Sequence, residues 1–193
     1  MTSEEALSEL KEGNRRFTEN RPLNARRDLA SIKACADDPH PFACVLACAD
    51  SRVPPEIIFD VGLGDLFTIR VAGNVANVDE LASIDYAVWQ MHTPLCVVMG
   101  HTGCRAVQAV VSGVALPLDI DQLLRQVKTS VTAVAHSHEG ISEAELVNAA
   151  IRDNICRSVE TLRSVLRKPA EQGTVRIVGA EYDVHTGDIV WLD

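Results

Sequence analysis

Two short motifs in this sequence contain side chains that can bind a metal ion. Cys48-Ala49-Asp50-Ser51-Arg52 offers one thiolate, and Gly100-His101-Thr102-Gly103-Cys104 offers an imidazole and a second thiolate. Two thiolates and one imidazole form a ligand set that is suited to zinc. Three protein ligands leave one tetrahedral position free, which separates a catalytic zinc site from a structural one. The two motifs therefore indicate a metal-bound water as the reactive group.

The segments around these motifs have the pattern of buried β-strands. Residues 42–48 form a continuous apolar run, which is typical of a strand buried on both faces of a sheet. Further strands are predicted at residues 66–71, 95–99, 174–180 and 188–192. His185-Thr186-Gly187 forms a hairpin-like turn before the last of these, which predicts an antiparallel edge strand.

Helical patterns lie between the predicted strands. They cover residues 79–91, 103–111 and 142–166, and residues 120–141 are predicted to form a helix and a polar loop. This alternation predicts one α/β domain over residues 1–193, built on a doubly wound, mainly parallel sheet of about five strands with helices on both faces.

Residues 1–37 are predicted to form a helical arm ahead of the sheet. Leu7, Leu10 and Phe17 recur at near-helical spacing within residues 2–20, and a second short helix is expected at residues 26–35. An isolated amphipathic helix needs an apolar surface to cover. We expect that surface to belong to a partner subunit.

The topology explains how two distant motifs can form one site. Cys48 ends the first strand and His101 follows the third, and reactive groups in doubly wound sheets gather at the carboxyl ends of strands. If these strands are neighbours, the two side chains converge. Cys104 is expected in the first turn of the next helix, on the same side as His101. A helix N-terminus also favours a thiolate at that position.

Composition limits the possible partners and location. The chain has 193 residues, 27 acidic and 18 basic, and a net charge of −9. This charge argues against nucleic acid or an anionic membrane as a partner, because both would repel the protein. The longest apolar stretches are strand-sized, far short of a membrane span. The acidic N-terminus has no secretion signal, so a cytoplasmic location is expected.

The other cysteines favour a simple interpretation. In a cytosolic protein of this size, metal binding or burial is favoured over a disulfide framework. We therefore interpret Cys35, Cys44, Cys96 and Cys156 as small buried hydrophobic residues.

The chain resembles the β-class carbonic anhydrases from about residue 6 to its C-terminus. The most specific parts of the resemblance are Cys48-Ala49-Asp50-Ser51-Arg52-Val53-Pro54, Gly64-Asp65-Leu66-Phe67-Thr68-Ile69-Arg70-Val71-Ala72-Gly73-Asn74 and Gly100-His101-Thr102-Gly103-Cys104. Members of that family hydrate carbon dioxide reversibly to bicarbonate and a proton. The resemblance implies that Cys48, His101 and Cys104 are the zinc ligands.

The resemblance also implies the surroundings of the metal. Asp50 and Arg52 correspond to the family's dyad beside the zinc, and Phe67 and Tyr86 fall at positions that line its substrate pocket. The family works as homodimers or higher homo-oligomers, with pockets at the subunit interface. A similar assembly is expected here.

The dyad has a chemical reason in a site with two thiolates. Zinc lowers the pKa of bound water and yields hydroxide as the nucleophile, but two thiolates weaken this effect by cancelling the metal's charge. Asp50 can compensate by accepting a hydrogen bond from the water, and Arg52 can keep Asp50 ionised through a bidentate pair. If Arg52 released Asp50, the carboxylate could take the fourth zinc position and switch the site off. Alternatively, Asp50-Ser51-Arg52 is only a helix cap with a surface ion pair.

Two departures from the family pattern bear on the substrate. The family commonly has a substrate-contacting glutamine nine residues before the first zinc cysteine, where this chain has Pro39. It usually has a glycine after the second zinc cysteine, where this chain has Arg105. Arg105 therefore starts at the pocket, where its side chain can point to solvent, fill the pocket, attract anions or replace the lost amide.

These departures leave three functions open. The leading one is a zinc lyase that hydrates carbon dioxide. The second is a hydrolase of carbonyl sulfide or carbon disulfide on the same fold. The third is a non-catalytic homologue that binds zinc or an anion, although a structural site has no need of the Asp50–Arg52 dyad.

Overall fold

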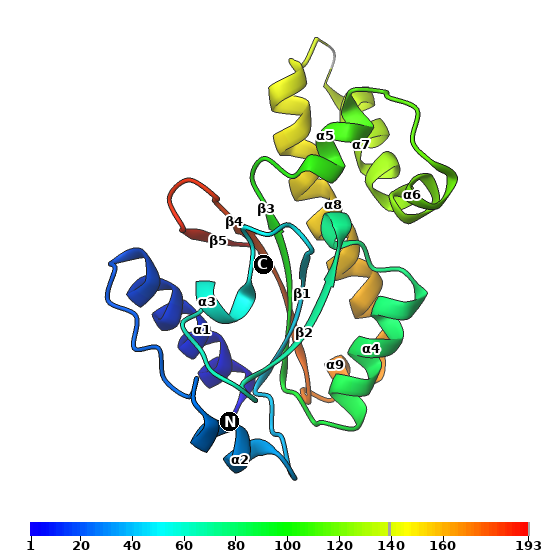
Figure 1. Ribbon diagram of the computed structural model, residues 1–193. Helices are drawn as coiled ribbons and strands as arrows, with labels where there is room; N and C mark the ends of the chain where they lie inside the picture. The colour runs from blue at the N-terminus through cyan, green and yellow to red at the C-terminus, as the bar shows by residue number, and fades with distance from the viewer. Residues whose placement is uncertain (139, 193) are drawn as a thin grey trace.

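The architecture is a five-stranded sheet with helices on both faces. The computed structural model describes residues 1–138 and 140–192. The sheet has the order β2-β1-β3-β4-β5, and its first four strands are parallel while β5 runs antiparallel to β4 (Figure 1). The strands are β1 (Ala43–Cys48), β2 (Leu66–Val71), β3 (Leu95–His101), β4 (Arg176–Tyr182) and β5 (Ile189–Leu192). The predicted fold class and the antiparallel edge strand are confirmed.

The longer helices of the structure lie where the sequence pattern predicts helices. They are α1 (Ser3–Thr18), α2 (Leu29–Cys35), α3 (Pro55–Ile58), α4 (Val78–Trp89), α5 (Arg105–Val111), α6 (Leu118–Leu123), α7 (Arg125–Ser137), α8 (Glu143–Val165), α9 (Arg167–Glu171) and the 3₁₀ helix η1 (Ala72–Asn74). The sequence pattern does not predict α3, α9 and η1, because so few residues carry no readable periodicity, and residues 118–137 form the two helices α6 and α7 where one was expected. Within the described part of the chain, no helix combines the length and apolar character needed to cross a bilayer.

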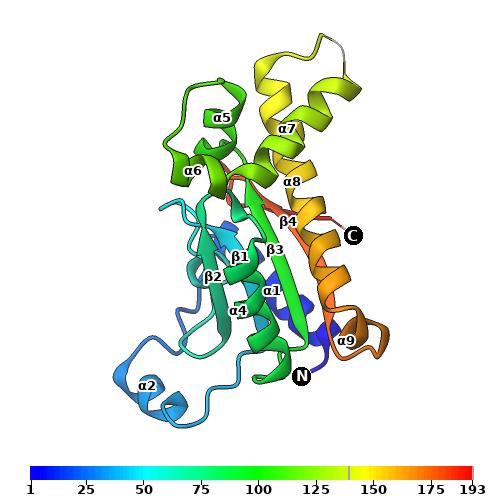
Figure 2. The same ribbon diagram turned by 90° about the vertical axis from the view of Figure 1, so that its right-hand side faces the viewer.

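Strand residues alternate between two apolar cores. Cys44, Leu46 and Cys48 of β1 face the core that is covered by α4 and α8. Ala43 and Val45 face the core on the side of α1. Figures 1 and 2 show the sheet between these two helical layers, with α5, α6 and α7 beyond the carboxyl ends of the strands. Cys48 therefore lies on the α4/α8 side, at the end of its strand.

The apolar stripe of the N-terminal helix packs on its own chain, which corrects the expectation that a partner subunit covers Leu7 and Leu10. Leu7 and Leu10 are buried in the core beneath the sheet. Gly13 allows a close approach, because a Cβ there would lie 1.8 Å from the carbonyl oxygen of Phe59. Asn14 Nδ2 donates to the carbonyl oxygen of Gly187 at 2.8 Å. A periodic apolar stripe shows that a helix needs a partner surface, but it does not show which chain supplies that surface.

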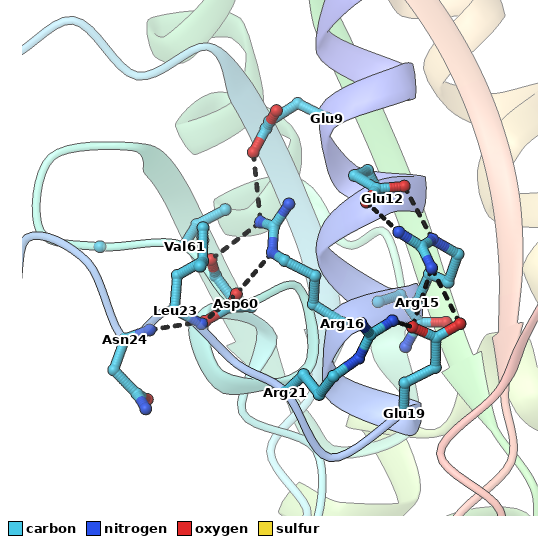
Figure 3. Close-up of polar contacts among 12 residues, drawn as sticks. Glu9, Glu12, Arg15, Arg16, Glu19, Arg21, Leu23, Asn24, Asp60 and Val61 are labelled. Atoms are coloured by element: carbon cyan, nitrogen blue, oxygen red, sulfur yellow. Dashed lines mark hydrogen bonds and ion pairs between the residues drawn. The ribbon is translucent and has the colours of Figure 1, made fainter.

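A buried carboxylate fixes the end of α1 to the segment after α3. The side chain of Asp60 is 0% exposed, and it accepts hydrogen bonds from Arg16 Nε at 2.7 Å and from the N–H groups of Leu23 and Asn24 at 2.9 and 3.0 Å (Figure 3). Burial alone would raise the pKa of Asp60, but these donors hold it below its ordinary value. Asp60 thus joins α1 and the following loop to the segment that comes after the Asp50–Arg52 motif.

We expect Asp60→Ala to lower the free energy of unfolding by about 3–5 kcal/mol, because it leaves two N–H groups without their partner and the Arg16 guanidinium with only its 3.3 Å contact to the exposed Glu9. Since the folded pKa is depressed, this stabilisation is complete above the unfolded pKa and is lost as the pH falls through the folded pKa. Denaturant unfolding of both proteins at several pH values measures the difference. Glu12→Ala, which removes an exposed ion pair with Arg15, is the control and should cost less than about 1 kcal/mol. Equal losses in the two variants would contradict the anchoring role.

Candidate metal centre

The structure brings the three predicted metal ligands together. Strands β1 and β3 are neighbours, so Cys48 and His101 meet at the carboxyl ends of adjacent strands. The Sγ atoms of Cys48 and Cys104 are 4.0 Å apart, and the ligand atoms of all three residues lie within 4.8 Å of one another. All three side chains are buried.

Two local details differ from the sequence expectation. His101 is the last residue of β3, paired with Tyr182 of β4, and does not follow the strand. Cys104 is the N-cap of α5 and lies outside its first turn. Gly103 makes the sharp connection possible, because its φ of +63° is a conformation that residues with side chains rarely adopt. The outcome is the same three-ligand cluster.

The hydrogen bonding of His101 prepares one ring nitrogen for a metal. Nδ1 lies 2.9 Å from the carbonyl oxygen of Thr102, which can only accept, so Nδ1 carries the proton. Nε2 therefore presents a bare lone pair, and it is buried without a hydrogen-bond partner among the described residues. An orphaned acceptor of this kind, aimed at two thiols, fits the donor set of zinc.

The two thiols also fit a cation. Their mutual hydrogen bond lowers the pKa of Cys48 to about 4 and raises the pKa of Cys104, because a second negative charge would form beside the first in a buried place. Without a metal, the close contact of the two sulfur atoms therefore disfavours two thiolates. A divalent cation between them would remove the repulsion and let both cysteines ionise.

Asp50 and Arg52 form the predicted bidentate pair beside this cluster. Arg52 Nε and Nη2 donate to the two oxygens of Asp50 at 2.9 and 2.8 Å. These hydrogen bonds hold the pKa of the Asp50 carboxyl well below its usual range. Asp50 Oδ2 lies 4.0 Å from His101 Nε2, so an ionised carboxylate stands next to the expected metal position.

The backbone of the first motif is held by residues to which the sequence analysis gave no role. Arg70 of β2 donates to the carbonyl oxygens of Cys48 at 3.1 Å and Asp50 at 2.6 Å. The N–H of Gly73 donates to Cys48 Sγ at 3.4 Å. Both residues lie in the segment of the resemblance that covers residues 64–74, but the identity of their partners depends on the pairing of β1 with β2, which the local pattern does not specify.

The remaining predicted site residues lie in two different places. Arg105 is exposed and lines an open cavity of about 440 Å³ together with Asp50, Ser51 and Arg52. Phe67 and Tyr86 contact each other, with ring centroids 6.1 Å apart. Phe67 is level with Cys44, four residues before Cys48 and roughly 13 Å along the strand. The structure therefore does not bring these two rings to the metal centre of their own chain.

The burial of the other cysteines is partly as predicted. All six cysteines are free, and Cys44 and Cys96 are buried in the core between the sheet and α8. Cys35 is only half-buried and Cys156 is exposed, which corrects the interpretation of these two as core residues.

The chain is similar to carbonic anhydrases along most of its length. The carbonic anhydrase family matches residues 43–189, a range that contains both motifs. Carbonic anhydrase 2 of Mycobacterium tuberculosis is 34% identical over 192 residues, covering 97% of this chain and 92% of that protein.

Solved structures share the fold. The β-carbonic anhydrase CafA of Aspergillus fumigatus aligns with a TM-score of 0.78 and 27% identity, over 98% of this chain and 90% of that chain. A tetrameric β-carbonic anhydrase of Sordaria macrospora aligns with a TM-score of 0.76 and 25% identity, over 83% of this chain and 85% of that chain.

Proposed function

The chain belongs to the β-class carbonic anhydrase family, and on that basis we propose that Cys48, His101 and Cys104 are its zinc ligands. Its activity is the zinc-dependent, reversible hydration of carbon dioxide to bicarbonate and a proton. The single observation that supports the ligand assignment best is the bare Nε2 of His101, which is buried without a partner beside two thiols.

We propose that Asp50 and Arg52 are the catalytic dyad. When bound, zinc supplies a Lewis acid that activates water as the nucleophile. Asp50 is ionised and 4.0 Å from the His101 nitrogen, so its carboxylate can accept a hydrogen bond from that water and orient it. Arg52 fixes the carboxylate through two hydrogen bonds and also donates to the carbonyl oxygen of Gly103 at 3.2 Å. It therefore ties the two motifs together across the mouth of the site.

An inactive state can form if the contact between Arg52 and Asp50 breaks. Asp50 is held to Arg52 here, and loss of that pair would free the carboxylate to approach the metal position. We propose this movement as the route by which the site can close.

The substrate is tested by comparing two linear molecules on the zinc-loaded enzyme. Hydration of carbon dioxide is measured by stopped flow and hydrolysis of carbonyl sulfide by release of hydrogen sulfide. We expect kcat/KM for carbon dioxide to exceed that for carbonyl sulfide. The reverse order would favour the hydrolase alternative that Pro39 and Arg105 keep open, and no turnover of either substrate would favour a non-catalytic zinc protein.

We propose that the protein is a homodimer or a higher homo-oligomer, and that Phe67 and Tyr86 line the pocket of the neighbouring copy. Tyr86 and Trp89 of α4 are each 53% exposed, and α4 packs against β2, which is the edge strand at the end of the sheet opposite β5. The related Sordaria macrospora enzymes are tetrameric, which supports assembly here. Sedimentation of the wild type tests the proposal. A monomer with full activity would overturn it, because Phe67 and Tyr86 lie away from their own metal centre.

Arg105 is proposed to attract anions to the pocket mouth. It is exposed and forms no ion pair with any described residue, so its charge is available to the cavity that it shares with Asp50 and Arg52. Solvent screening limits the attraction at such a site to about 1 kcal/mol.

We therefore expect Arg105→Gly to weaken inhibition by small anions about fivefold, which is the equivalent of about 1 kcal/mol, and to raise carbon dioxide turnover if bicarbonate release is slow. Inhibition constants and kcat on the zinc-loaded variant measure both effects. Arg105→Lys keeps the charge and should behave like the wild type. Unchanged inhibition in Arg105→Gly would show that the side chain points away from the pocket.

We also propose a cytoplasmic location. All six cysteines are free, and Cys48 and Cys104 must stay reduced to bind the metal. A reducing compartment satisfies this requirement.

A further inference from the structure

A buried cluster of polar side chains lies behind the metal centre. Asn154 and Ser158 of α8 are 1% and 0% exposed, and Gln126 of α7 joins them. Gln126 Nε2 lies 2.8 Å from Asn154 Oδ1 and 2.7 Å from Ser158 Oγ. Buried amides and hydroxyls are costly unless their hydrogen bonds are made. Each of the three side chains also makes a hydrogen bond to the backbone of one short segment, residues 73–76.

That segment carries the hydrogen-bond donor to Cys48. Asn154 Nδ2 donates to the carbonyl oxygen of Gly73 at 2.8 Å, and the N–H of the same glycine donates to Cys48 Sγ at 3.4 Å. Ser158 Oγ donates to the carbonyl oxygen of Asn74 at 3.3 Å. Gly73 and Asn74 both have positive φ, at +74° and +41°, so the segment adopts a conformation that its surroundings must hold in place.

An N–H group that donates a hydrogen bond to a thiolate changes how much electron density the sulfur donates to a metal. The hydrogen bond draws electron density away from sulfur and stabilises its ionised form. In a site with two thiolates, this reduces the charge donated to zinc and preserves its strength as a Lewis acid. The orientation of the Gly73 N–H therefore bears on both metal affinity and reactivity.

We propose that Asn154, held by Gln126, is a positioning residue of the zinc centre, which holds Gly73 so that its N–H donates to the Cys48 thiolate. Asn154 acts through the backbone and does not touch the reacting atoms. The inference rests on the proposed assignment of Cys48 as a zinc ligand. If the cluster only joined α7 to α8, changes to it would alter stability but not the electronic state of the sulfur.

The experiment compares Asn154→Leu with Ser158→Ala in the 193-residue protein, prepared in a cobalt-substituted form for the spectra and in a zinc-loaded form for metal loss. Both variants lose buried hydrogen bonds of the same cluster, but only Asn154 contacts Gly73. The readouts are the thiolate-to-cobalt charge-transfer band in the near ultraviolet, the rate of zinc loss to a chelator, and the unfolding midpoint. In Asn154→Leu we expect the band to move to longer wavelength, because the sulfur becomes more electron-rich, and zinc loss to be about tenfold faster. Ser158→Ala should keep the wild-type band and lose zinc less than twofold faster.

Gln126→Met is the second variant in case Asn154→Leu does not fold. Gln126 is only half-buried, so its replacement disturbs the core less, and it removes the hydrogen bond to Asn154 Oδ1. The variant should shift the band in the same direction by a smaller amount. Wild-type spectra in Asn154→Leu, or in Gln126→Met if the first variant is insoluble, would overturn the proposal. The proposal would also be overturned if the band shift and the rate of zinc loss scaled with the drop in unfolding midpoint in the same way in the Asn154 and Ser158 variants. Wild-type protein with no charge-transfer band would instead refute the ligand assignment, so the two failures are distinguishable.

Discussion

Replacing His101 with alanine will remove most of the bound zinc and lower carbon dioxide hydration by about 10³-fold or more. In the proposed site the imidazole supplies one of three protein ligands, and its Nε2 has no other partner among the described residues. With two ligands left, the close contact of the Cys48 and Cys104 sulfur atoms would again disfavour two thiolates, since nothing relieves their repulsion. Zinc content after dialysis and the hydration rate of the same sample measure the two losses.

Cys44→Ala provides a matched control for this loss. Cys44 lies on the same strand as Cys48, faces the same core and, like Cys48, forms no disulfide. It is four residues before Cys48, which ends the strand. It should keep one zinc per chain and the wild-type rate, whereas Cys48→Ser should resemble His101→Ala. Full zinc occupancy in both Cys48→Ser and His101→Ala would disprove the ligand assignment.

Replacing Asp50 with asparagine will keep the zinc and lower kcat/KM for hydration by about 10²–10³-fold, the usual range for loss of a positioned acceptor. Asparagine keeps the shape of the side chain but loses the negative charge that Arg52 stabilises and that, in the proposed mechanism, accepts a hydrogen bond from the water. Zinc content and stopped-flow rates separate this effect from metal loss.

Ser51→Ala is the control for the dyad variant. Ser51 lines the same open cavity, between Asp50 and Arg52 in the sequence, and the proposed mechanism does not use its hydroxyl. Its loss should change kcat/KM less than twofold. An Asp50→Asn enzyme with the wild-type rate would remove the dyad from the mechanism.

The sequence could predict the sheet and the metal cluster because both depend on strong local patterns. The continuous apolar run before Cys48 requires a buried strand, and a parallel sheet sends the ends of its strands to one edge. Two motifs at such ends must then converge when their strands are neighbours. The exact end of β3 and the N-cap position of Cys104 were missed, because element boundaries depend on backbone geometry that short motifs do not specify.

The rest of the site depends on contacts that only the folded chain defines. The stripe of Leu7 and Leu10 predicted a packed helix but not the surface that covers it, which belongs to the same chain. Asn154 lies outside the quoted motifs and Arg70 lies in one without a predicted role, and each donates to the backbone of a segment at least 20 residues away. Their roles follow from the tertiary structure, where an arginine or a buried amide meets carbonyl groups beside the metal centre.

The most direct test of the zinc assignment is the hydration rate of wild-type protein as zinc is restored stepwise to the metal-free form. The three ligands form one site per chain, so the rate should rise in proportion to bound zinc and level off at about one zinc per chain. A hydration rate that does not change as zinc fills the site would contradict the assignment.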